Sequence, residues 1–570
     1  MKKLKVAFAA VGLIVLVILG YVGVRLIEKY TPTKEQADPA VLYGTEPGRP
    51  AVFYNYELLD VRGIYENGQT YLPLSWVNQA VNERFYWDAT EELLVYALPD
   101  QIVYADAETK GSSGAPLLLN RDGEVYLALG LISSYTDAQI YDYEATEVGR
   151  VFVNDWGSRD TARVTKTAKV REKGGIKSPI VTEVSHDTEV LVLERLDDWS
   201  RIATPDGNVG YIRNKALADT GSRTFSRESD NYVPSAAYGE AFGFSMYAGA
   251  HVEQVYQKTS LDEKIVLGWH QVTNQEANGQ LESILAQTKG LNVIAPTWFA
   301  LSDNEGNYRS LASQAYVEKA HEKGLQVWAL LDNFSDNVQT EVLLSSTTTR
   351  RKLINSLMAE VERYDLDGLN MDFEGIKEEA GVHYIQFLRE LSIPCREKGI
   401  VLSVDNYVPT AANEFYNRAE QANVADYLIV MGYDEHWAGG TPGSVASIDF
   451  VKNGIADTLK QAPKEQVINA VPFYTRIWTE KDGEVTSKAY GIARAKQWIE
   501  ENHVELHWQE PLGQYYGEME LPDSLSYLWM EEEDSLRLKM EAVREADLAG
   551  VACWKLGLED AAAWESISWD

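Results

Sequence analysis

The stretch Asp367-Gly-Leu-Asn-Met-Asp-Phe-Glu374 decides what fold and site the C-terminal half of the chain is expected to have. Asn370, Asp372 and Glu374 lie two residues apart, so in a β-strand their side chains share one face. Burying such a row is unfavourable, and a strand of purely structural role would carry Val or Ile there. The pattern therefore predicts a functional site; the alternative is a polar network that only fixes the fold.

Short apolar segments alternate with amphipathic stretches from residue 263 onward. This alternation is typical of βα units and a parallel sheet. Eight such strands predict a multidomain protein whose residues 261–570 form a C-terminal (β/α)8 TIM barrel. The long gap at 479–549 predicts an insertion after the seventh strand. The expected strands are 264–269, 293–299, 326–331, 368–374, 401–407, 427–433, 467–474 and 550–556.

Four motifs carry a resemblance to a known family. The stretch from Asp367 to Glu374 is similar to the Asp-Gly-x-Asp-x-Asp-x-Glu signature of glycoside hydrolase family 18, the chitinase-like family. Three later motifs agree with this family in order and place, and phrases such as Trp554-Lys-Leu-Gly-Leu-Glu-Asp resemble its peptidoglycan and spore-cortex-lytic branch. The later motifs are Met431-Gly-Tyr-Asp434, Ala470-Val-Pro-Phe-Tyr474 and Gly550-Val-Ala-Cys-Trp554.

The resemblance implies a retaining, substrate-assisted hydrolase that cuts β-1,4 bonds at N-acetylglucosamine, without a metal or cofactor. Glu374 would be the general acid, Asp372 would orient the substrate's acetamido group, and Tyr433 would hydrogen-bond it. One departure is Asn370, which stands where many chitinases carry aspartate and cannot ionise. The residues expected to bind substrate are Asn370, Asp434, Trp554, Tyr474 and Trp298.

Two alternatives to peptidoglycan hydrolysis remain open at this point. The chain could be a chitinase that acts on chitooligosaccharides, or a non-catalytic surface protein that binds glycans on the same barrel. Retention of Glu374 argues against the second, because a lectin has no need of that acid, whereas Asn370 argues for it.

The N-terminal segment predicts a membrane anchor. An uncharged, mostly apolar run from Val6 to Val24 is close to the ~20 residues that span a bilayer as a helix. Lys2, Lys3 and Lys5 precede it, which favours a cytoplasmic N-terminus. Residues 1–27 are thus expected to be an uncleaved signal anchor, with a signal peptide that is removed as the alternative, and residues 28–48 a stalk. The expected localisation is a bacterial cell membrane, single-pass, with the C-terminal domains outside.

Residues 49–156 contain an internal repeat. Gly68-Gln-Thr-Tyr-Leu-Pro-Leu74 recurs as Gly123-Glu-Val-Tyr-Leu-Ala-Leu129, and Tyr86 is matched by Tyr141. Each copy predicts a turn, a strand, an amphipathic segment and further strands. The small α+β module that this predicts resembles the copper amine oxidase N-terminal-like domain, although no copper ligands are visible.

Residues 161–217 are rich in strand patterns. Trp199-Ser-Arg-Ile is followed by an Asp-Gly turn and Gly210-Tyr-Ile212, which resembles the end of a bacterial SH3-like β-barrel. Such modules imply the cell wall as a partner; a structural spacer is the alternative. Residues 218–260 have weak periodicity and predict a linker.

The charge of the chain restricts its partners. With 86 acidic against 52 basic residues, the formal net charge is −34. This excludes nucleic acid as an expected partner and argues against adhesion to anionic lipids or anionic wall polymers. The two cysteines exclude a disulfide framework and a cysteine-based zinc cluster.

Overall fold

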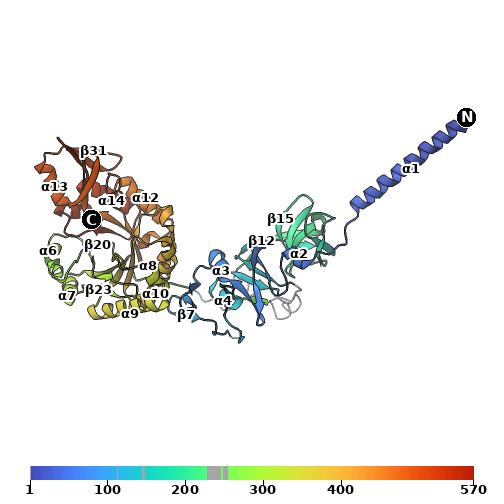
Figure 1. Ribbon diagram of the computed structural model, residues 1–570, viewed down its shortest axis with the longest axis horizontal. Coiled ribbons are helices and arrows are strands. Elements are labelled where there is room, and N and C mark those ends of the chain that lie inside the picture. The colour runs from blue at the N-terminus through green and yellow to red at the C-terminus, as the bar shows by residue number, and fades with distance from the viewer. Residues whose placement is uncertain (1, 112, 144–147, 227–244, 248–253, 570) are drawn as a thin grey trace. The chain divides into compact units, whose positions relative to one another are not determined.

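A computed structural model describes all residues except 1, 112, 144–147, 227–244, 248–253 and 570 (Figure 1). The chain forms two compact units. The first comprises Met1–Phe85 and Ala105–Glu253, and the second comprises Tyr86–Tyr104 and Gln254–Asp570. The chain therefore passes between the units three times.

The second unit contains the expected (β/α)8 barrel, which is confirmed. Its eight strands are parallel, and pairing of β21 with β24 closes the sheet. The strands are β20 (Ile265–His270), β21 (Val293–Pro296), β24 (Gln326–Asp332), β25 (Gly368–Asp372), β26 (Val401–Tyr407), β27 (Tyr427–Met431), β28 (Val467–Pro472) and β34 (Gly550–Trp554).

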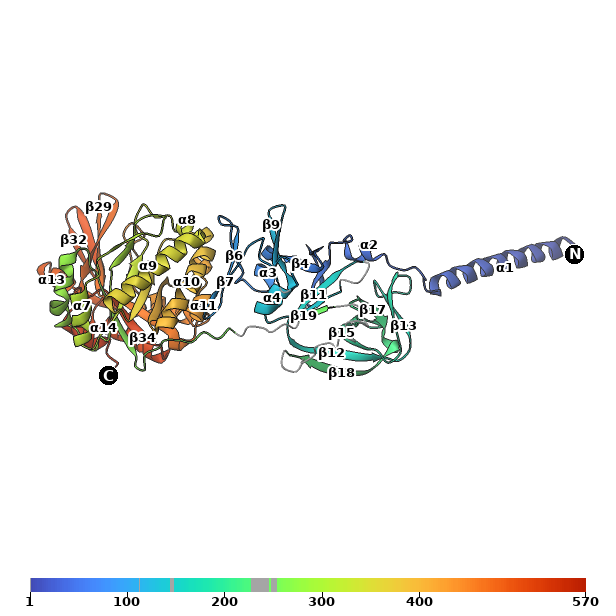
Figure 2. The ribbon, with the colours of Figure 1, turned by 90° about the horizontal axis from the view of Figure 1, so that it is seen from below.

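Helices surround this sheet and bury its outer face (Figures 1 and 2). Leu369, Met371 and Phe373 belong to the outer core, as the two-residue alternation predicts. A separate inner core fills the barrel with side chains such as Leu267 and Leu330. The helices are α6 (Leu281–Leu285), α7 (Gln314–Glu322), α8 (Thr340–Ser345), α9 (Thr347–Tyr364), α10 (Glu378–Lys398), α11 (Arg418–Val424), α12 (Ile448–Thr458), α14 (Glu533–Glu545) and α15 (Ala561–Ser566).

Two additions interrupt the barrel. The hairpin of β22 (Phe299–Leu301) and β23 (Tyr308–Ser310) follows β21. The expected insertion after the seventh barrel strand is a five-stranded antiparallel sheet with one helix. It consists of β29 (Tyr474–Lys481), β30 (Glu484–Gly491), α13 (Ile492–Glu501), β31 (Leu506–Gln509), β32 (Gln514–Leu521) and β33 (Ser524–Met530).

Residues 86–104, which the sequence pattern places in the 49–156 module, instead pack with the barrel. They form the strands β5 (Tyr86–Asp88), β6 (Leu93–Ala97) and most of β7 (Ile102–Ala105), which lie beside α10 (Figure 2). We call residues 86–104 the strap. Asp88 of the strap is fully buried and accepts a hydrogen bond of 2.6 Å from the Thr347 amide, in the first turn of α9.

The charge of the strap suits this position. Glu91 accepts hydrogen bonds from the Thr348 amide and the Ser346 hydroxyl at the same helix end. Carboxylates stabilise a helix N-terminus, where backbone N–H groups lack partners. Close to this contact, Arg350 forms a buried ion pair with Glu390. The Arg350 guanidinium also donates a hydrogen bond of 3.2 Å to the Tyr86 hydroxyl oxygen.

The remainder of the 49–156 module lies in the first unit. The two repeat copies pair with each other, because β4 (Gln69–Pro73) and β9 (Glu124–Ala128) are antiparallel neighbours. Each is followed by a short helix, α3 (Leu74–Ala80) or α4 (Leu129–Tyr135). The other strands of the module are β1 (Ala51–Tyr54), β2 (Glu57–Arg62), β3 (Ile64–Glu66), β8 (Leu118–Arg121), β10 (Gln139–Asp142) and β11 (Arg150–Asn154). A strand from the segment that was expected to be a linker, β19 (Ser245–Tyr247), pairs with β10.

The strand-rich region after it is a seven-stranded antiparallel sheet around a small core. Its last strand covers 218–225, which the sequence pattern assigns to a linker; residues 227–244 and 248–253 of that linker lie outside the described residues. The strands are β12 (Gly157–Val164), β13 (Ala168–Arg171), β14 (Ile180–Val184), β15 (Glu189–Arg195), β16 (Trp199–Ala203), β17 (Val209–Arg213) and β18 (Leu217–Phe225), with a 3-10 turn at Asn214–Ala216.

Helix α1 (Lys2–Tyr30) precedes these sheets. Within the described residues it is the one helix long and apolar enough to cross a membrane, over Phe8–Tyr30. The expected stalk at 28–48 is not free of structure. Its Thr33 and Ala37 amides donate to the carbonyls of Ile176 and Ile180, and a short helix α2 (Pro39–Tyr43) follows.

The contact of Asp88 with α9 generates a stability prediction. We expect Asp88→Ala to lower the free energy of unfolding by about 1–2 kcal/mol, because the buried Thr347 amide of the helix and the Thr90 and Glu91 amides of the strap lose their acceptor. Urea unfolding followed by circular dichroism measures this. Thr90→Ala, a change at an exposed position of the same turn, is the control and should have little effect. Equal stability of both variants would contradict the assigned role of Asp88.

Candidate active site

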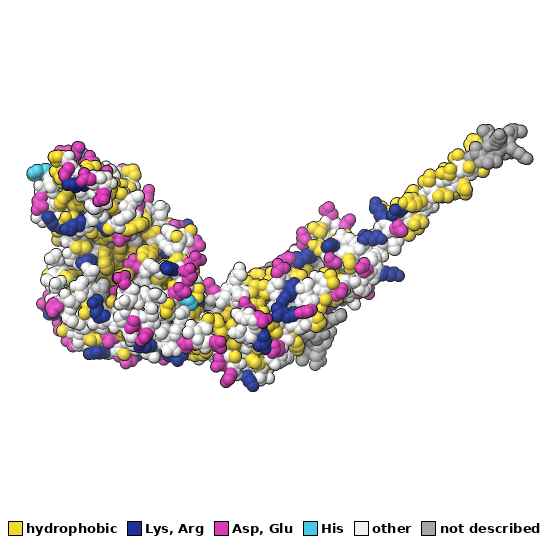
Figure 3. Space-filling view, in the orientation of Figure 1, with side chains coloured by type: hydrophobic (Ala, Val, Ile, Leu, Met, Phe, Trp, Pro, Cys, Tyr) yellow, Lys and Arg dark blue, Asp and Glu magenta, His cyan; other side chains and the backbone are white. Residues whose placement is uncertain are grey.

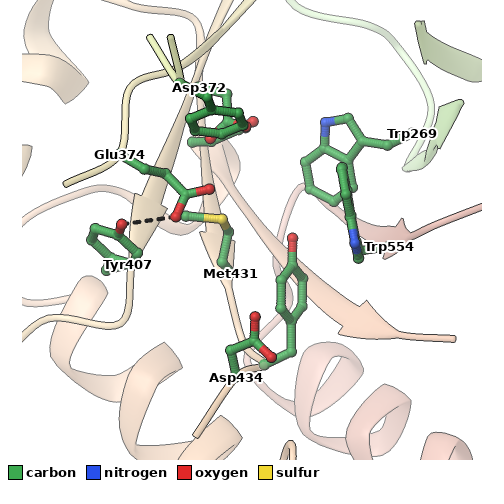
Figure 4. Close-up of a pocket in the computed structure, with 10 residues that line it drawn as sticks. Trp269, Asp372, Glu374, Tyr407, Met431, Asp434 and Trp554 are labelled. Atoms are coloured by element: carbon green, nitrogen blue, oxygen red, sulfur yellow. Dashed lines mark hydrogen bonds between the residues drawn. The ribbon is translucent and has the colours of Figure 1, made fainter. Parts of the chain in front are cut away.

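A cavity of about 570 Å³ opens at the carboxyl ends of the barrel strands (Figure 4). This is the end of a (β/α)8 barrel at which active sites lie. Residues from β20, β25, β26, β27 and β34 and from the loops after β24, β25 and β27 line it. They are Trp269, Phe334, Asp372, Glu374, Asp405, Tyr407, Met431, Tyr433, Asp434 and Trp554.

Glu374 lies two residues after β25 and is held at both its backbone and its side chain. Asn333 donates to its carbonyl and accepts from its amide, each at 2.9 Å. The Tyr407 hydroxyl donates to its Oε2 at 2.7 Å and accepts from the Gly375 amide (Figure 4). Burial raises the pKa of Glu374, the Tyr407 hydrogen bond opposes this, and the nearby charge of Asp332 adds to the rise.

Asp372, the last residue of β25, is only 5% exposed. Its Oδ1 is buried and has no hydrogen-bond partner among the described residues. Burial, together with the charges of Asp405 and Glu374, raises the pKa of Asp372 well above its ordinary value. The cavity thus contains a carboxyl oxygen that lacks a donor, close to the carboxyl group of Glu374.

Asp405 is the third buried carboxyl group of the cavity, and the sequence pattern did not single it out. It comes from β26, and the Asn370 amide donates to its Oδ1 at 2.8 Å. Asn370 also donates to Ser403 and accepts from the Trp269 indole at 2.9 Å, so its orientation is fixed. Burial raises the pKa of Asp405 well above its ordinary value, against the effect of the Asn370 hydrogen bond.

Asn370 therefore does not line the cavity but supports a residue that does. The same two-residue rule that singled out β25 also applies to β26, where Ser403, Asp405 and Tyr407 share one face of the strand. That spacing was the available signal for both Asp405 and Tyr407.

Tyr433, Asp434 and Tyr474 come together on the opposite side of the cavity. Tyr433 and Asp434 line it directly. The Tyr474 hydroxyl donates to Asp434, whose φ of 55° lies in the left-handed region that aspartate tolerates better than most residues. Burial raises the pKa of Tyr433 well above its ordinary value, which keeps its hydroxyl a hydrogen-bond donor.

Two tryptophans form an aromatic wall. Trp269 and Trp554 make an edge contact with ring centroids 5.8 Å apart (Figure 4). Of these, Trp554 was expected and Trp269 was not. Trp298, which was expected to bind substrate, is not among the lining residues. It is 1% exposed, and its indole donates to Asn278.

Other polar residues of the barrel have structural partners. Asp367 accepts from the Val327 amide and contacts His321, in agreement with its opposite parity to Glu374. His270 is buried against Tyr316. Among the described residues, no group of three His, Cys, Asp or Glu side chains is arranged to hold a metal ion.

Comparison with protein families agrees with this geometry. The model of glycosyl hydrolases family 18 matches residues 257–559. The chain belongs to this family. It is a chitinase-like glycoside hydrolase, and a bacterial SH3 domain model also matches residues 166–218.

Related family 18 proteins are distant in sequence. The uncharacterized glycosylase YvbX of Bacillus subtilis (strain 168) is 26% identical over 290 residues, which are 49% of this chain and 84% of that protein. The cortical fragment-lytic enzyme of the same organism is 24% identical over 244 residues, and the match covers 41% of this chain but only 56% of that enzyme. The Bacillus cereus spore cortex-lytic enzyme SleL shares the fold, with a TM-score of 0.50, 20% identity and coverage of 56% of this chain and 75% of that one.

The raised pKa of Asp405 generates a second prediction. A carboxyl group whose pKa is raised by folding opposes folding once it ionises. This penalty is complete above the folded-state pKa and absent below the unfolded value of about 3.9. We expect Asp405→Asn to increase the free energy of unfolding by about 1–2 kcal/mol at neutral pH, since the new amide oxygen still accepts from Asn370.

Urea unfolding at several pH values measures this gain, which should shrink toward zero near pH 4. Asp336→Asn, at an exposed position in the loop after β24, is the matched control and should change stability little at any pH. A gain that persists unchanged into acid would show that the removed charge is not its cause.

Proposed function

We propose that the chain hydrolyses β-1,4 glycosidic bonds at N-acetylglucosamine, with retention of configuration and with help from the substrate's own acetamido group. One observation carries this proposal: the buried, unpartnered Oδ1 of Asp372 beside Glu374. A buried acceptor without a donor is unfavourable, and the acetamido N–H of an N-acetylated sugar supplies such a donor. The second carboxyl group of ordinary retaining enzymes, which attacks the sugar, is then not required.

In the proposed mechanism Glu374 gives its proton to the glycosidic oxygen as the bond to the anomeric carbon breaks. The raised pKa of Glu374 favours the protonated form that this step needs. The acetamido carbonyl oxygen of the substrate forms the new bond to the anomeric carbon. Asp372 holds the acetamido N–H and stabilises the positive charge that develops there. Tyr433 donates to the acetamido oxygen and orients it.

In the second step Glu374, now ionised, takes a proton from water. As this proton leaves, the water oxygen bonds to the anomeric carbon and the bond from that carbon to the acetamido oxygen breaks, so two inversions give net retention. Asp434, positioned by Tyr474, supports Tyr433 and the acetamido group. Trp554 and Trp269 offer ring faces and edges for the apolar surface of the sugar.

We infer that Asp405 supplies the ionisable carboxyl group that Asn370 lacks. In many chitinases the residue at that position is an aspartate that shares a proton with the middle carboxyl group. Here the neutral amide of Asn370 links to Asp405, one strand further along. Burial and the neighbouring carboxyl groups raise the pKa of Asp372 and of Asp405 well above their ordinary values, so each charge disfavours the ionised form of its neighbour. We infer that Asp405 is the proton partner of Asp372.

Peptidoglycan is the substrate that the rest of the chain favours. The relatives in the comparisons include cortical fragment-lytic enzymes, and a bacterial SH3 domain is commonly a cell-wall-binding module. We propose that α1 anchors the chain in the membrane, which would hold the barrel near the wall. Hydrolysis of chitooligosaccharides is the competing activity, because the proposed chemistry requires only an N-acetylated sugar.

We also propose the domain order that the sequence predicts: an anchor at 1–27, a module of the copper amine oxidase N-terminal-like kind at 49–156, and an SH3-like module at 161–217 before the barrel at 261–570. The pairing of β4 with β9 supports the repeat within the second of these. Because the strap packs with the barrel unit, we do not expect the whole of 49–156 to fold as an independent domain.

The mechanism predicts the effect of removing the acid. Glu374→Gln should lower hydrolysis by about 10²–10⁴-fold, the usual contribution of general acid catalysis, while binding stays within a few-fold. Glutamine keeps the shape of the side chain and can still accept from Tyr407. The full chain in detergent is tested on peptidoglycan, spore-cortex fragments and chitooligosaccharides, and mass spectrometry identifies the products and the bond cut.

Glu414→Gln, at an exposed position after β26, is the matched control and should keep full activity. Absence of cleavage of all three substrates by the unaltered chain would refute the enzymatic mechanism. Cleavage of chitooligosaccharides alone would refute the assignment to peptidoglycan.

The surroundings of Glu374 predict opposite pH shifts for two substitutions. Activity falls as pH rises through the pKa of the general acid, because the proton is lost. Tyr407→Phe removes a donor to the carboxylate and should move this alkaline limb to higher pH. Asp332→Asn removes a negative charge that raises the pKa of Glu374 and should move the limb to lower pH.

Each shift should amount to about one pH unit or less, as expected for one neighbouring charge or hydrogen bond. The pH dependence of kcat/KM on a soluble substrate measures both, with Asp336→Asn as a control that should not move the limb. If the two variants shifted the limb in the same direction, Glu374 would not be the titrating acid.

A further inference from the structure

A second hollow lies in the first unit, far along the chain from the catalytic residues. It is a groove of about 1040 Å³ between the segment at 31–34 and the SH3-like sheet. Its floor comes from β13, β16 and β17 and the turns beside them. We call it the basic groove, because six of its lining residues are cations: Lys34, Lys166, Lys169, Arg171, Arg213 and Lys215.

Among the residues that the structure describes, no aspartate or glutamate lines the basic groove. This is unusual in a chain with 86 acidic and 52 basic residues. Its four lysines are exposed and form no ion pair with any residue that the structure describes. Lys and Arg side chains are also seen near the base of α1 in the space-filling view (Figure 3). Like charges repel unless an anion lies between them, so this arrangement favours an anionic ligand.

Arg171 is built into the groove rather than merely placed on its surface. Its side chain is 4% exposed and donates to the carbonyls of Ser178 and Thr33. The bond to Thr33, together with the bond from the Thr33 amide to the Ile176 carbonyl, fixes the segment at 31–34 against the sheet. Burial and the neighbouring charge of Arg213 lower the pKa of Arg171. A buried cation beside a second cation is retained at a cost in free energy, which a bound anion would offset.

Trp199 gives the groove an apolar wall. The Arg213 guanidinium stacks over its indole ring at 5.2 Å from the centroid. A stacked guanidinium is held in plane and presents N–H groups in the fork that fits phosphate oxygens. The groove therefore offers a phosphate-binding face next to an apolar face.

The place of the groove in the chain identifies the source of the phosphate. Thr31, the first lining residue, directly follows Tyr30, where α1 ends. Lys34 lies only four residues beyond the helix, within about 14 Å of extended chain. If α1 crosses the membrane as proposed, the groove is held at the outer bilayer surface, next to the phosphate groups of the lipid headgroups.

We propose that the basic groove binds the phosphate headgroup of an anionic phospholipid, with the apolar wall at Trp199 against the lipid's glycerol. The net charge of the chain had argued against adhesion to anionic lipid, and this groove is the local exception. The proposal rests on the membrane anchor proposed for α1 but not on the glycosidase activity.

Photocrosslinking of the full chain in vesicles tests this proposal. The vesicles are phosphatidylcholine with a small fraction of photoreactive phosphatidylglycerol, or of photoreactive phosphatidylcholine, and mass spectrometry maps the labelled peptides. We expect the phosphatidylglycerol probe to label peptides of the groove at least fivefold more than the phosphatidylcholine probe. Higher salt should reduce this labelling, because the attraction is electrostatic.

The variant replaces the four groove lysines, Lys34, Lys166, Lys169 and Lys215, by Gln and should lose at least four-fifths of the labelling. Its control makes the same change of charge at four exposed lysines elsewhere, Lys110, Lys323, Lys352 and Lys452, and should keep the labelling. Equal labelling by both probes, or equal loss in both variants, would overturn the proposal.

Two further outcomes separate this proposal from others. Vesicle flotation tests the anchor by itself: a chain that does not float refutes the anchor, whereas a chain that floats without groove labelling refutes the groove. A soluble glycerol-phosphate polymer is the competitor. If it binds the groove while the lipid probe does not label it, the ligand is a wall polymer and the lipid proposal is wrong.

Discussion

Three carboxyl groups buried at one end of a barrel impose the main constraint on this molecule. Asp372, Asp405 and Glu374 cannot all ionise in so small a space without a large electrostatic penalty. The barrel meets this constraint with neutral partners: the amide of Asn370 and the hydroxyl of Tyr407 each donate to one carboxyl group. The outer core and its helices hold these strands in place, so the fold tolerates at one end a cluster that most proteins avoid.

The barrel could be predicted from sequence because its signals are local. Alternation along β25 depends only on the geometry of a strand, and it placed Asp372 and Glu374 correctly in the cavity. Asn370 lies on the same face of β25 but below the cavity, where it contacts Asp405. Alternation predicts which face of a strand a side chain occupies but not how far it lies from the cavity. Asp405 was within reach of the same rule and was overlooked because its strand carries no family motif.

Contacts between segments distant in sequence could not be predicted in this way. Trp298 follows a barrel strand, as a ligand-binding tryptophan would, but its indole turns to Asn278 within the core. The partner of Asp88 is a helix more than 250 residues further on. A sum of charges over the chain likewise gave no sign of the basic groove, since a net value of −34 carries no information on where the cations lie.

The strap has a consequence for durability. Because it belongs to the barrel unit while its neighbours in sequence belong to the other, the backbone crosses between the units at 85–86, 104–105 and 253–254. Two domains joined by a single linker separate when one peptide bond of that linker is cut. Here a single cut at any one crossing leaves the two units joined through the others and through the folded contacts of the strap. In surroundings rich in proteases, such a chain would keep its catalytic barrel attached after a nick that would release a simply tethered domain.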